Sequence, residues 1–148
     1  MLIVYEPVHS ASAESLRGKE EDILALTWEQ RRWLRGKFRT AKGREIALAL
    51  PTGTPLASGA IVLIQEDWYV RVEPLAEPLL GVTPRDHAES IRLAFEIGNR
   101  HFPLALDGHT ILVPDDLVMT QLFTRLDIAY ERRQAVFSPI GNGLAYVR

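Results

Sequence analysis

The segment Gly98-Asn99-Arg100-His101-Phe102-Pro103-Leu104-Ala105-Leu106 joins a predicted helix to a predicted strand, and the elements on either side of it decide the fold. Gly98 is expected to end the helix, because glycine takes the left-handed backbone conformation at little cost. The residues that follow, Phe102 to Leu106, alternate apolar side chains with a period of two, which is typical of a strand with one buried face. One histidine, His101, lies between the two predicted elements.

The helix before this segment has a marked beginning and one apolar stripe. Thr83 is expected to cap its free N–H groups, and Pro84 suits the first helical position because an N–H is not needed there. Asp86 falls in the first turn, where the helix dipole favours a negative charge. The stripe predicted to face a core recurs at helical spacing and consists of Ala88, Ile91 and Phe95.

The elements after the segment complete a recognisable module. Asp107-Gly108 predicts a two-residue hairpin turn, and Thr110 to Val113 is the returning strand. Pro114-Asp115-Asp116 begins a second helix, and Ile128 to Phe137 supplies a last strand. The buried stripe expected on the second helix is Val118, Leu122 and Leu126, widened by Met119 and Phe123. Counted from Leu79 to Phe137, the order β-α-β-β-α-β predicts a ferredoxin-like unit.

The first half of the chain has strand patterns and no long helix. Residues 9–22 are rich in Ser, Ala, Glu, Lys and Gly and are expected to form a surface loop. The expected strands are Leu2 to Tyr5, Ile23 to Leu26, Phe38 to Thr40, Glu45 to Leu50, Ile61 to Ile64 and Trp68 to Val72. The prolines and glutamates of Glu73 to Pro78 are typical of a domain junction. The predicted fold class is therefore α+β, with an all-β domain at residues 1–73 and a ferredoxin-like domain at residues 74–148.

One stretch of the first half combines a helix start with a cluster of basic residues. Thr27 and Gln30 have the spacing of a capping box, yet no more than one helical turn is expected, because Arg31 to Thr40 suits a charged strand better. The basic residues in this stretch are interleaved with Trp33 and Phe38. The exposed face of an edge strand is the favoured interpretation over a binding patch. The cluster consists of Arg31, Arg32, Arg35, Lys37 and Arg39.

Composition excludes several classes of protein. The 148 residues include 47% hydrophobic and 24% charged residues, values typical of a globular domain that buries a core. A net charge of −2 gives no reason to expect a nucleic-acid partner. The absence of cysteine excludes disulfides and thiolate metal sites. The chain has neither a signal-peptide pattern nor an apolar run of the ~20 residues that a membrane helix needs, so a cytoplasmic protein without a membrane partner is expected.

Few residues are candidates for chemistry. His9, His87 and His109 are expected to be exposed surface residues. His101 differs because it follows a helix end, where a carbonyl oxygen could accept a hydrogen bond from one ring nitrogen and leave the other for a metal. Glu20-Glu21-Asp22 is interpreted as a charge run in a loop without a partner in sequence. No catalytic motif is found, so no catalytic residue is assigned and a binding or carrier protein is favoured over an enzyme.

Several stretches, taken in order, resemble the urease accessory nickel chaperone family, UreE. Leu26-Thr27-Trp28-Glu29-Gln30-Arg31-Arg32 is similar to the start of a strand in that family. Gly43-Arg44-Glu45 through Leu50-Pro51-Thr52-Gly53-Thr54-Pro55-Leu56 is similar to its next conserved segment. Gly98-Asn99-Arg100-His101 matches its most specific motif. The likeness runs from about residue 23 to about residue 146, and the ordered set is far more specific than one tetrapeptide.

The resemblance implies a protein that binds Ni(II) as cargo and delivers it to apo-urease. It implies a peptide-binding type of β domain and a homodimer paired through the ferredoxin-like domains, with His101 of both chains on the two-fold axis and Gly98, Asn99 and Arg100 as the supporting motif. His109 is a weaker candidate ligand. Zn(II) or Cu(II) could substitute in vitro, because imidazole also suits those ions. The implied partners are apo-urease and the other urease accessory proteins, including the accessory GTPase, and a tetramer is possible when metal is bound.

The sequence departs from many members of that family. It has no histidine after His109, so the histidine-rich tail that stores nickel in some relatives is missing. Where some relatives carry histidines before the last helix, this chain has Val113-Pro114-Asp115-Asp116. Two other functions therefore stay open. One is a protein-binding adaptor of the urease maturation complex with little metal function, and the other is an unrecognised hydrolase, which only scattered carboxylates support.

Overall fold

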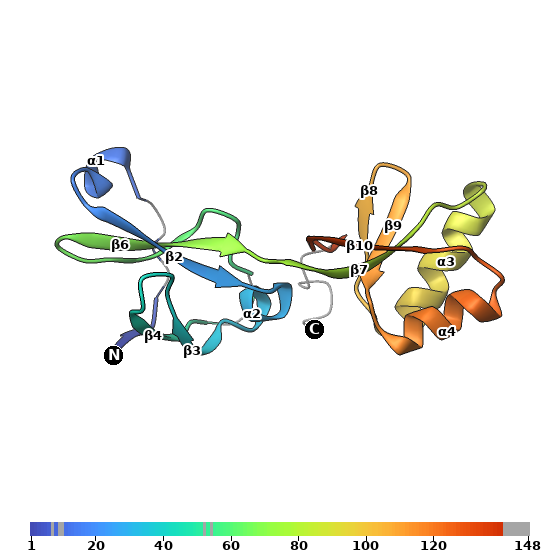
Figure 1. Ribbon diagram of the computed structural model, residues 1–148, viewed down its shortest axis with the longest axis horizontal. Coiled ribbons are helices and arrows are strands. Elements are labelled where there is room, and N and C mark those ends of the chain that lie inside the picture. The colour runs from blue at the N-terminus through green and yellow to red at the C-terminus, as the bar shows by residue number, and fades with distance from the viewer. Residues whose placement is uncertain (7, 9–10, 52, 54, 141–148) are drawn as a thin grey trace. The chain divides into compact units, whose positions relative to one another are not determined.

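The computed structural model describes residues 1–6, 8, 11–51, 53 and 55–140. The chain divides into two compact units, Met1–Leu75 and Ala76–Arg148. Figure 1 shows that strands dominate the first unit, whereas the second combines a sheet with helices. The predicted α+β class is confirmed.

The first unit contains two three-stranded sheets. In one, β4 (Glu45–Ala49) lies between β1 (Leu2–Val4), to which it is parallel, and β3 (Arg35–Arg39), to which it is antiparallel. In the other, β6 (Trp68–Pro74) lies between its parallel neighbour β2 (Glu20–Leu26) and its antiparallel neighbour β5 (Ile61–Ile64). The alternation predicted in the first sheet is confirmed, because Ile46, Leu48 and Leu50 are all buried. Side chains from both sheets form one apolar core.

The structure corrects two predictions in this unit. Residues 9–22 are not a continuous loop, since α1 (Ala13–Leu16) is helical and β2 already begins at Glu20. The capping box at Thr27 is present, but α2 (Trp28–Trp33) extends over 6 residues, and Arg31 and Arg32 belong to it and not to a strand. The helix is longer because it ends at a buried residue, Leu34, which takes the left-handed conformation and donates its N–H to Gln30.

The second unit is the predicted ferredoxin-like module. Its four strands lie in the order β10 (Glu131–Val136), β7 (Ala76–Val82), β9 (Thr110–Pro114) and β8 (Ala105–Asp107), and all neighbours are antiparallel. The helices α3 (His87–Asn99) and α4 (Leu117–Arg125) lie on the same side of this sheet (Figure 1). Their buried faces and the strands enclose a second apolar core.

The predicted beginning and buried face of α3 are both wrong. Asp86, not Thr83, caps the helix, and its side chain accepts a hydrogen bond from the N–H of Glu89. The residues of α3 that reach the core are Leu93 and Ile97. Ile91 and Phe95 are 58% and 68% exposed. The helix carries apolar residues on two faces, and sequence spacing does not distinguish which face packs against the sheet.

Smaller corrections concern α4 and the hairpin before it. Met119, Leu122 and Phe123 are buried as predicted, whereas Val118 is exposed. The strands β8 and β9 pair Asp107 with Thr110, so the two-residue turn is Gly108-His109 and not Asp107-Gly108. Only the first of these two residues has a positive φ, which is the requirement of a type II′ turn with glycine in its first central position.

Candidate metal centre

The end of α3 holds His101 in a defined position. The N–H of His101 donates to the carbonyl oxygen of Gly98 over 2.9 Å, and the N–H of Phe102 donates to that of Ile97 over 3.3 Å. Phe102 also packs against the apolar core of the second unit. His101 is therefore fixed on both sides, by the last turn of the helix and by a residue anchored in the core.

His101 itself takes the conformation that the sequence suggested for Gly98. Its φ is 62°, in the left-handed region, while Gly98 lies inside α3 with an ordinary helical backbone. The left-handed conformation costs a residue with a Cβ roughly 1–2 kcal/mol relative to glycine. The prediction that Gly98 ends the helix is wrong because the last turn continues through Asn99 before the chain reverses at His101.

Arg100, from the predicted supporting motif, acts on the helix end. Its guanidinium donates to the carbonyl oxygen of Glu96 over 2.9 Å and lies 3.5 Å from a carboxylate oxygen of the same residue. A positive charge at this position also interacts favourably with the negative end of the helix dipole. The arginine thus stabilises the turn that presents His101.

The imidazole of His101 is exposed, and no residue in the described ranges forms a hydrogen bond with it. The hydrogen bond to a helix carbonyl considered from the sequence is therefore not formed. Those carbonyl oxygens already accept from other donors: Ile97 and Gly98 from backbone N–H groups, and Glu96 from Arg100. Both ring nitrogens of His101 face solvent or a molecule that docks there.

Neither His87 nor His109 lies beside His101 within one chain. His87 is the first residue of α3, and His109 lies in the turn of the β8–β9 hairpin. The hairpin turn is near the start of α3, because the hydroxyl oxygens of Thr83 and Thr110 are 3.0 Å apart. His101 follows the other end of a 13-residue helix, which is about 20 Å long. His9 lies outside the described residues.

Among the described histidines, His101 therefore stands alone at this position. Among the described residues, no group of three or more His, Asp or Glu side chains is arranged to hold a metal ion. One exposed face of α3 is apolar instead. Ile91, Phe95 and Gly98 recur at spacings of four and three residues, so they share one exposed face of α3.

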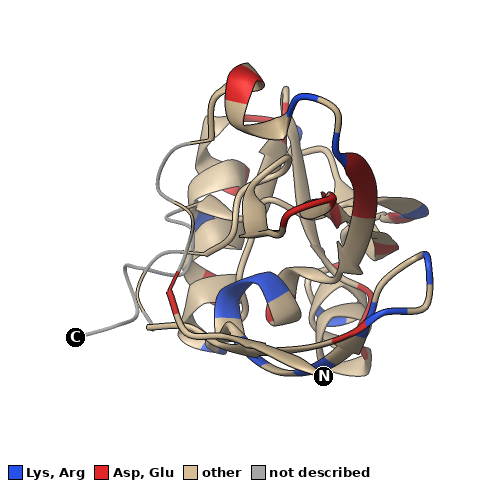
Figure 2. Ribbon diagram, turned by 90° about the vertical axis from the view of Figure 1, so that its left-hand side faces the viewer, with Lys and Arg blue, Asp and Glu red and all other residues tan. Residues whose placement is uncertain are grey.

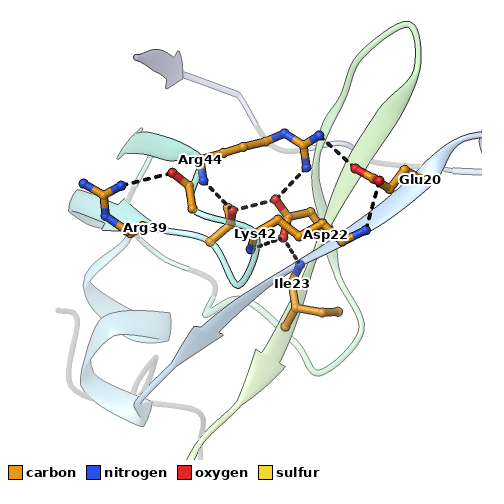
Figure 3. Close-up of polar contacts among 8 residues, drawn as sticks. Glu20, Asp22, Ile23, Arg39, Lys42 and Arg44 are labelled. Carbon is orange, nitrogen blue, oxygen red and sulfur yellow. Dashed lines mark hydrogen bonds and ion pairs between the residues drawn. The ribbon is translucent and has the colours of Figure 1, made fainter.

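Sequence reasoning missed a polar cluster in the first unit, which Figure 3 shows. Asp22 is buried, and its carboxylate accepts from the Thr40 hydroxyl (2.5 Å), from the Arg44 guanidinium (2.9 Å) and from two backbone N–H groups. Glu20 pairs with Arg44 at 2.8 Å and with Lys42 at 3.2 Å. These residues join the acidic start of β2, seen as red ribbon in Figure 2, to the turn between β3 and β4. The prediction that Glu20-Glu21-Asp22 is an unpartnered loop is wrong.

This cluster has the character of a structural anchor. Burial by itself raises the pKa of Asp22, but the hydrogen bonds from Thr40, Arg44 and the backbone outweigh burial, so the pKa lies below its ordinary value. A carboxylate with four donors has no free lone pair directed at a ligand. The sequence did not reveal Thr40 and Arg44 as partners of Asp22, because they are 18 and 22 residues away in the chain and lie in the turn between β3 and β4.

The chain is an α+β protein of two units, the first built mainly of strands and the second ferredoxin-like. Its candidate site is one exposed histidine, which follows α3. Comparison with protein families identifies the lineage. The model of the UreE urease accessory protein N-terminal domain matches residues 6–74, and that of the UreE C-terminal domain matches residues 77–147. The chain belongs to the UreE family of urease accessory proteins. It is thus related to accessory proteins and not to a catalytic subunit of urease.

Individual relatives agree with the family models. The chain is 38% identical over 117 residues to a urease accessory protein UreE of Ectopseudomonas mendocina, covering 78% of this chain and 70% of that protein. It is 31% identical over 129 residues to a UreE of Lysinibacillus sphaericus, with 86% of each chain covered. Similarity to a UreE of Synechococcus is 32% over 131 residues, covering 83% and 88%. Within the described part of the chain, no helix is long and apolar enough to span a membrane.

Proposed function

We propose that this protein is a nickel metallochaperone that binds Ni(II) as cargo through His101 and delivers it to apo-urease during assembly of the urease active site. The observation that carries the proposal is the exposed imidazole of His101, fixed by the end of α3 in a left-handed conformation and without a hydrogen-bond partner among the described residues. A histidine with a left-handed backbone is uncommon, and such residues are frequent at functional sites. Membership of the urease accessory family supports urease as the destination.

The proposed site requires two chains. A single imidazole holds a divalent ion too weakly for a carrier, and in the part that the structure describes no group of three or more His, Asp or Glu side chains of one chain is arranged to hold a metal ion. A two-fold axis through this position would bring two copies of His101 to one ion. We therefore propose a homodimer in which the ion is shared.

The exposed face of α3 supports this arrangement. Ile91 and Phe95 are large apolar side chains exposed on the helix that precedes His101. Gly98 continues that face, and a Cβ placed on it would meet no atom of the described chain within 4 Å. Nothing within one chain therefore requires glycine there, whereas a second helix packed closely against the same face would.

Two imidazoles and solvent ligands suit a carrier. A site closed by four protein ligands holds its metal firmly, whereas a site completed by water releases it more readily. Imidazole binds nickel, zinc and copper, and affinity alone favours copper over nickel. Zn(II) or Cu(II) should accordingly replace Ni(II) in vitro, and selectivity in the cell would depend on metal supply and on the receiving protein.

The remaining parts of the proposal concern place and partners. The relatives are urease accessory proteins, so we propose apo-urease and the other accessory proteins, including the accessory GTPase, as partners in the cytoplasm. His109 is the weaker candidate ligand; because it lies at the far end of α3, it would serve a separate ion or a metal-bound tetramer. The shared ion at His101 does not need it.

Calorimetric titration with Ni(II) tests the site. One ion should bind per two chains, and His101→Ala should abolish this binding. His87→Ala is the matched control, because it replaces an exposed histidine of the same unit away from the end of α3. Unchanged nickel binding by His101→Ala would contradict the proposed site.

The alternative function is a protein-binding adaptor of the urease maturation complex with little metal function of its own. It is favoured because, among the described residues, no group of three or more His, Asp or Glu side chains is arranged to hold a metal ion. Urease activation measured with the His101→Ala variant separates the two functions. Activation at the normal nickel concentration would support the adaptor, whereas activation only at raised nickel concentration supports the chaperone.

A further inference from the structure

A second surface of the molecule has the composition of a binding site and lies in the first unit. A hollow of about 370 Å³ is lined by Glu29, Gln30, Arg32, Trp33 and Arg35, which come from α2 and the beginning of β3. Its volume is within the range of roughly 300–1,000 Å³ in which proteins bind small ligands or a few side chains. Arg32 and Arg35 belong to the basic cluster that the sequence suggested was the exposed face of an edge strand. The structure places part of that cluster on a helix instead.

The two arginines of this hollow are available for a partner. Arg32 and Arg35 form no ion pair within the described residues, although Arg39, Arg44 and Arg71 of the same unit each pair with a glutamate. The guanidinium of Arg32 stacks on the ring of Trp28 at 4.9 Å, so its plane is held in place. Its Nε is buried and has no acceptor among those residues. A positioned guanidinium without a carboxylate is prepared for bidentate recognition of one.

Trp33 adds an apolar contact beside these charges. Its side chain is 62% exposed on the last residue of α2, whereas Trp28 of the same helix is buried. Exposed tryptophan next to unpaired arginine is the composition enriched at the centres of protein interfaces. An acidic group and an apolar side chain in the same ligand would use both features.

We propose that this hollow binds an acidic peptide segment of a partner protein, with carboxylates on Arg32 and Arg35 and an apolar side chain on Trp33. Charge complementarity selects this occupant. A nucleic-acid strand fits less well, because Glu29 lines the hollow and the chain carries a net charge of −2. The surface is independent of the nickel proposal, since none of its residues lies in the unit that carries His101.

The indole N–H signals in a two-dimensional NMR spectrum provide the test. The chain has only three tryptophans, and Trp33→Phe identifies the signal of Trp33. The probe is the synthetic peptide acetyl-Asp-Glu-Leu-Glu-Asp-amide, with acetyl-Lys-Arg-Leu-Arg-Lys-amide as the charge-reversed comparison. The acidic peptide should shift the Trp33 signal in a saturable manner that weakens with added salt, and the basic peptide should not.

Variants locate the binding. Arg35→Gln leaves the stacking of Arg32 on Trp28 intact and should lower the affinity for the acidic peptide about tenfold. The Arg32→Gln/Arg35→Gln double variant should lower this affinity further. Arg39→Gln, which removes a paired arginine of the same basic cluster, should leave the affinity unchanged. The proposal is overturned if millimolar acidic peptide leaves Trp33 unshifted, or if Arg35→Gln and Arg39→Gln bind alike. It is also overturned if an oligouridine shifts Trp33 more than the peptide does, or if protein concentration alone shifts it.

Discussion

The N–H of His101 donates to the carbonyl oxygen of Gly98 over 2.9 Å, and of these two residues the histidine, not the glycine, has the left-handed backbone. The ligand candidate is therefore also the residue that reverses the chain after α3. At this position the left-handed backbone favours glycine, whereas metal binding requires histidine. Substitutions of His101 can therefore separate the effect on folding from the effect on metal binding.

His101→Gly should stabilise the second unit by about 1 kcal/mol while abolishing nickel binding, because glycine takes a φ of 62° without the steric cost of a Cβ. Urea unfolding followed by circular dichroism at 222 nm measures the first effect and calorimetry the second. His101→Ala, which keeps the Cβ, should lose nickel without gaining stability. Equal unfolding free energies for the glycine and alanine variants would contradict this account of the helix end.

Phe95→Asp should convert the proposed dimer into a folded monomer. The side chain is 68% exposed in one chain, so a charge there should change the stability of the chain little. At a two-fold interface the same charge would be buried without a partner, which disfavours association. Sedimentation velocity at several concentrations measures the oligomeric state. Leu117→Asp on α4 is the control, because Leu117 is equally exposed but lies on another helix. A Phe95→Asp variant that stays dimeric would place the interface elsewhere.

Gly98→Ala should have opposite effects on the chain and on the dimer. Glycine within a helix costs up to about 1 kcal/mol relative to alanine, and the added Cβ would meet nothing within 4 Å. In the monomeric Phe95→Asp background the substitution should therefore raise stability. In the otherwise native chain it should weaken dimerisation, which a dilution series by sedimentation would reveal. Stronger or unchanged dimerisation would show that no second chain approaches Gly98 closely.

Asp22→Asn should destabilise the first unit at neutral pH and much less in acid. Hydrogen bonds from Thr40, Arg44 and the backbone lower the pKa of Asp22 in the folded state despite its burial. The stabilisation from the charged carboxylate is therefore present above the unfolded pKa of about 3.9 and is lost as the pH falls through the lower folded value. At neutral pH we expect a loss of about 3 kcal/mol, since one partner of a buried ion pair is removed.

Tryptophan fluorescence follows this loss selectively, because Trp28, Trp33 and Trp68 all lie in the first unit. Unfolding should be measured in urea at neutral pH and again near pH 3. The difference between the native chain and Asp22→Asn should shrink at the lower pH. Glu45→Gln, which removes the exposed partner of Arg39, is the control and should change stability little at either pH. A difference that is independent of pH would mean that the charge of Asp22 is not what stabilises the cluster.

Local signals in the sequence were sufficient for the order of elements in the second unit, but not for the short helices α1 and α2 of the first. The alternation of Ile46, Leu48 and Leu50, the hairpin signal around Gly108 and the apolar residues of α4 depend on neighbours a few positions apart. Such signals report secondary structure directly, and their order implied the ferredoxin-like unit. His101 was singled out by its place after a helix and by the resemblance that the Gly-Asn-Arg-His motif carries.

What the sequence by itself determined, then, is the succession of strands and helices in the second unit, the absence of cysteine chemistry and the one histidine next to a helix end. Only the tertiary structure decided which apolar face of α3 is buried, since Leu93 and Ile97 compete with Ile91 and Phe95 on hydrophobicity alone and packing against the sheet selects between them. It also decided the partners of Asp22 and the left-handed backbone of His101. The buried face of α3 and the partners of Asp22 depend on contacts between segments that are distant in the chain. The backbone of His101 depends on where the last helical turn ends. The spacing of residues in the sequence determines none of these features.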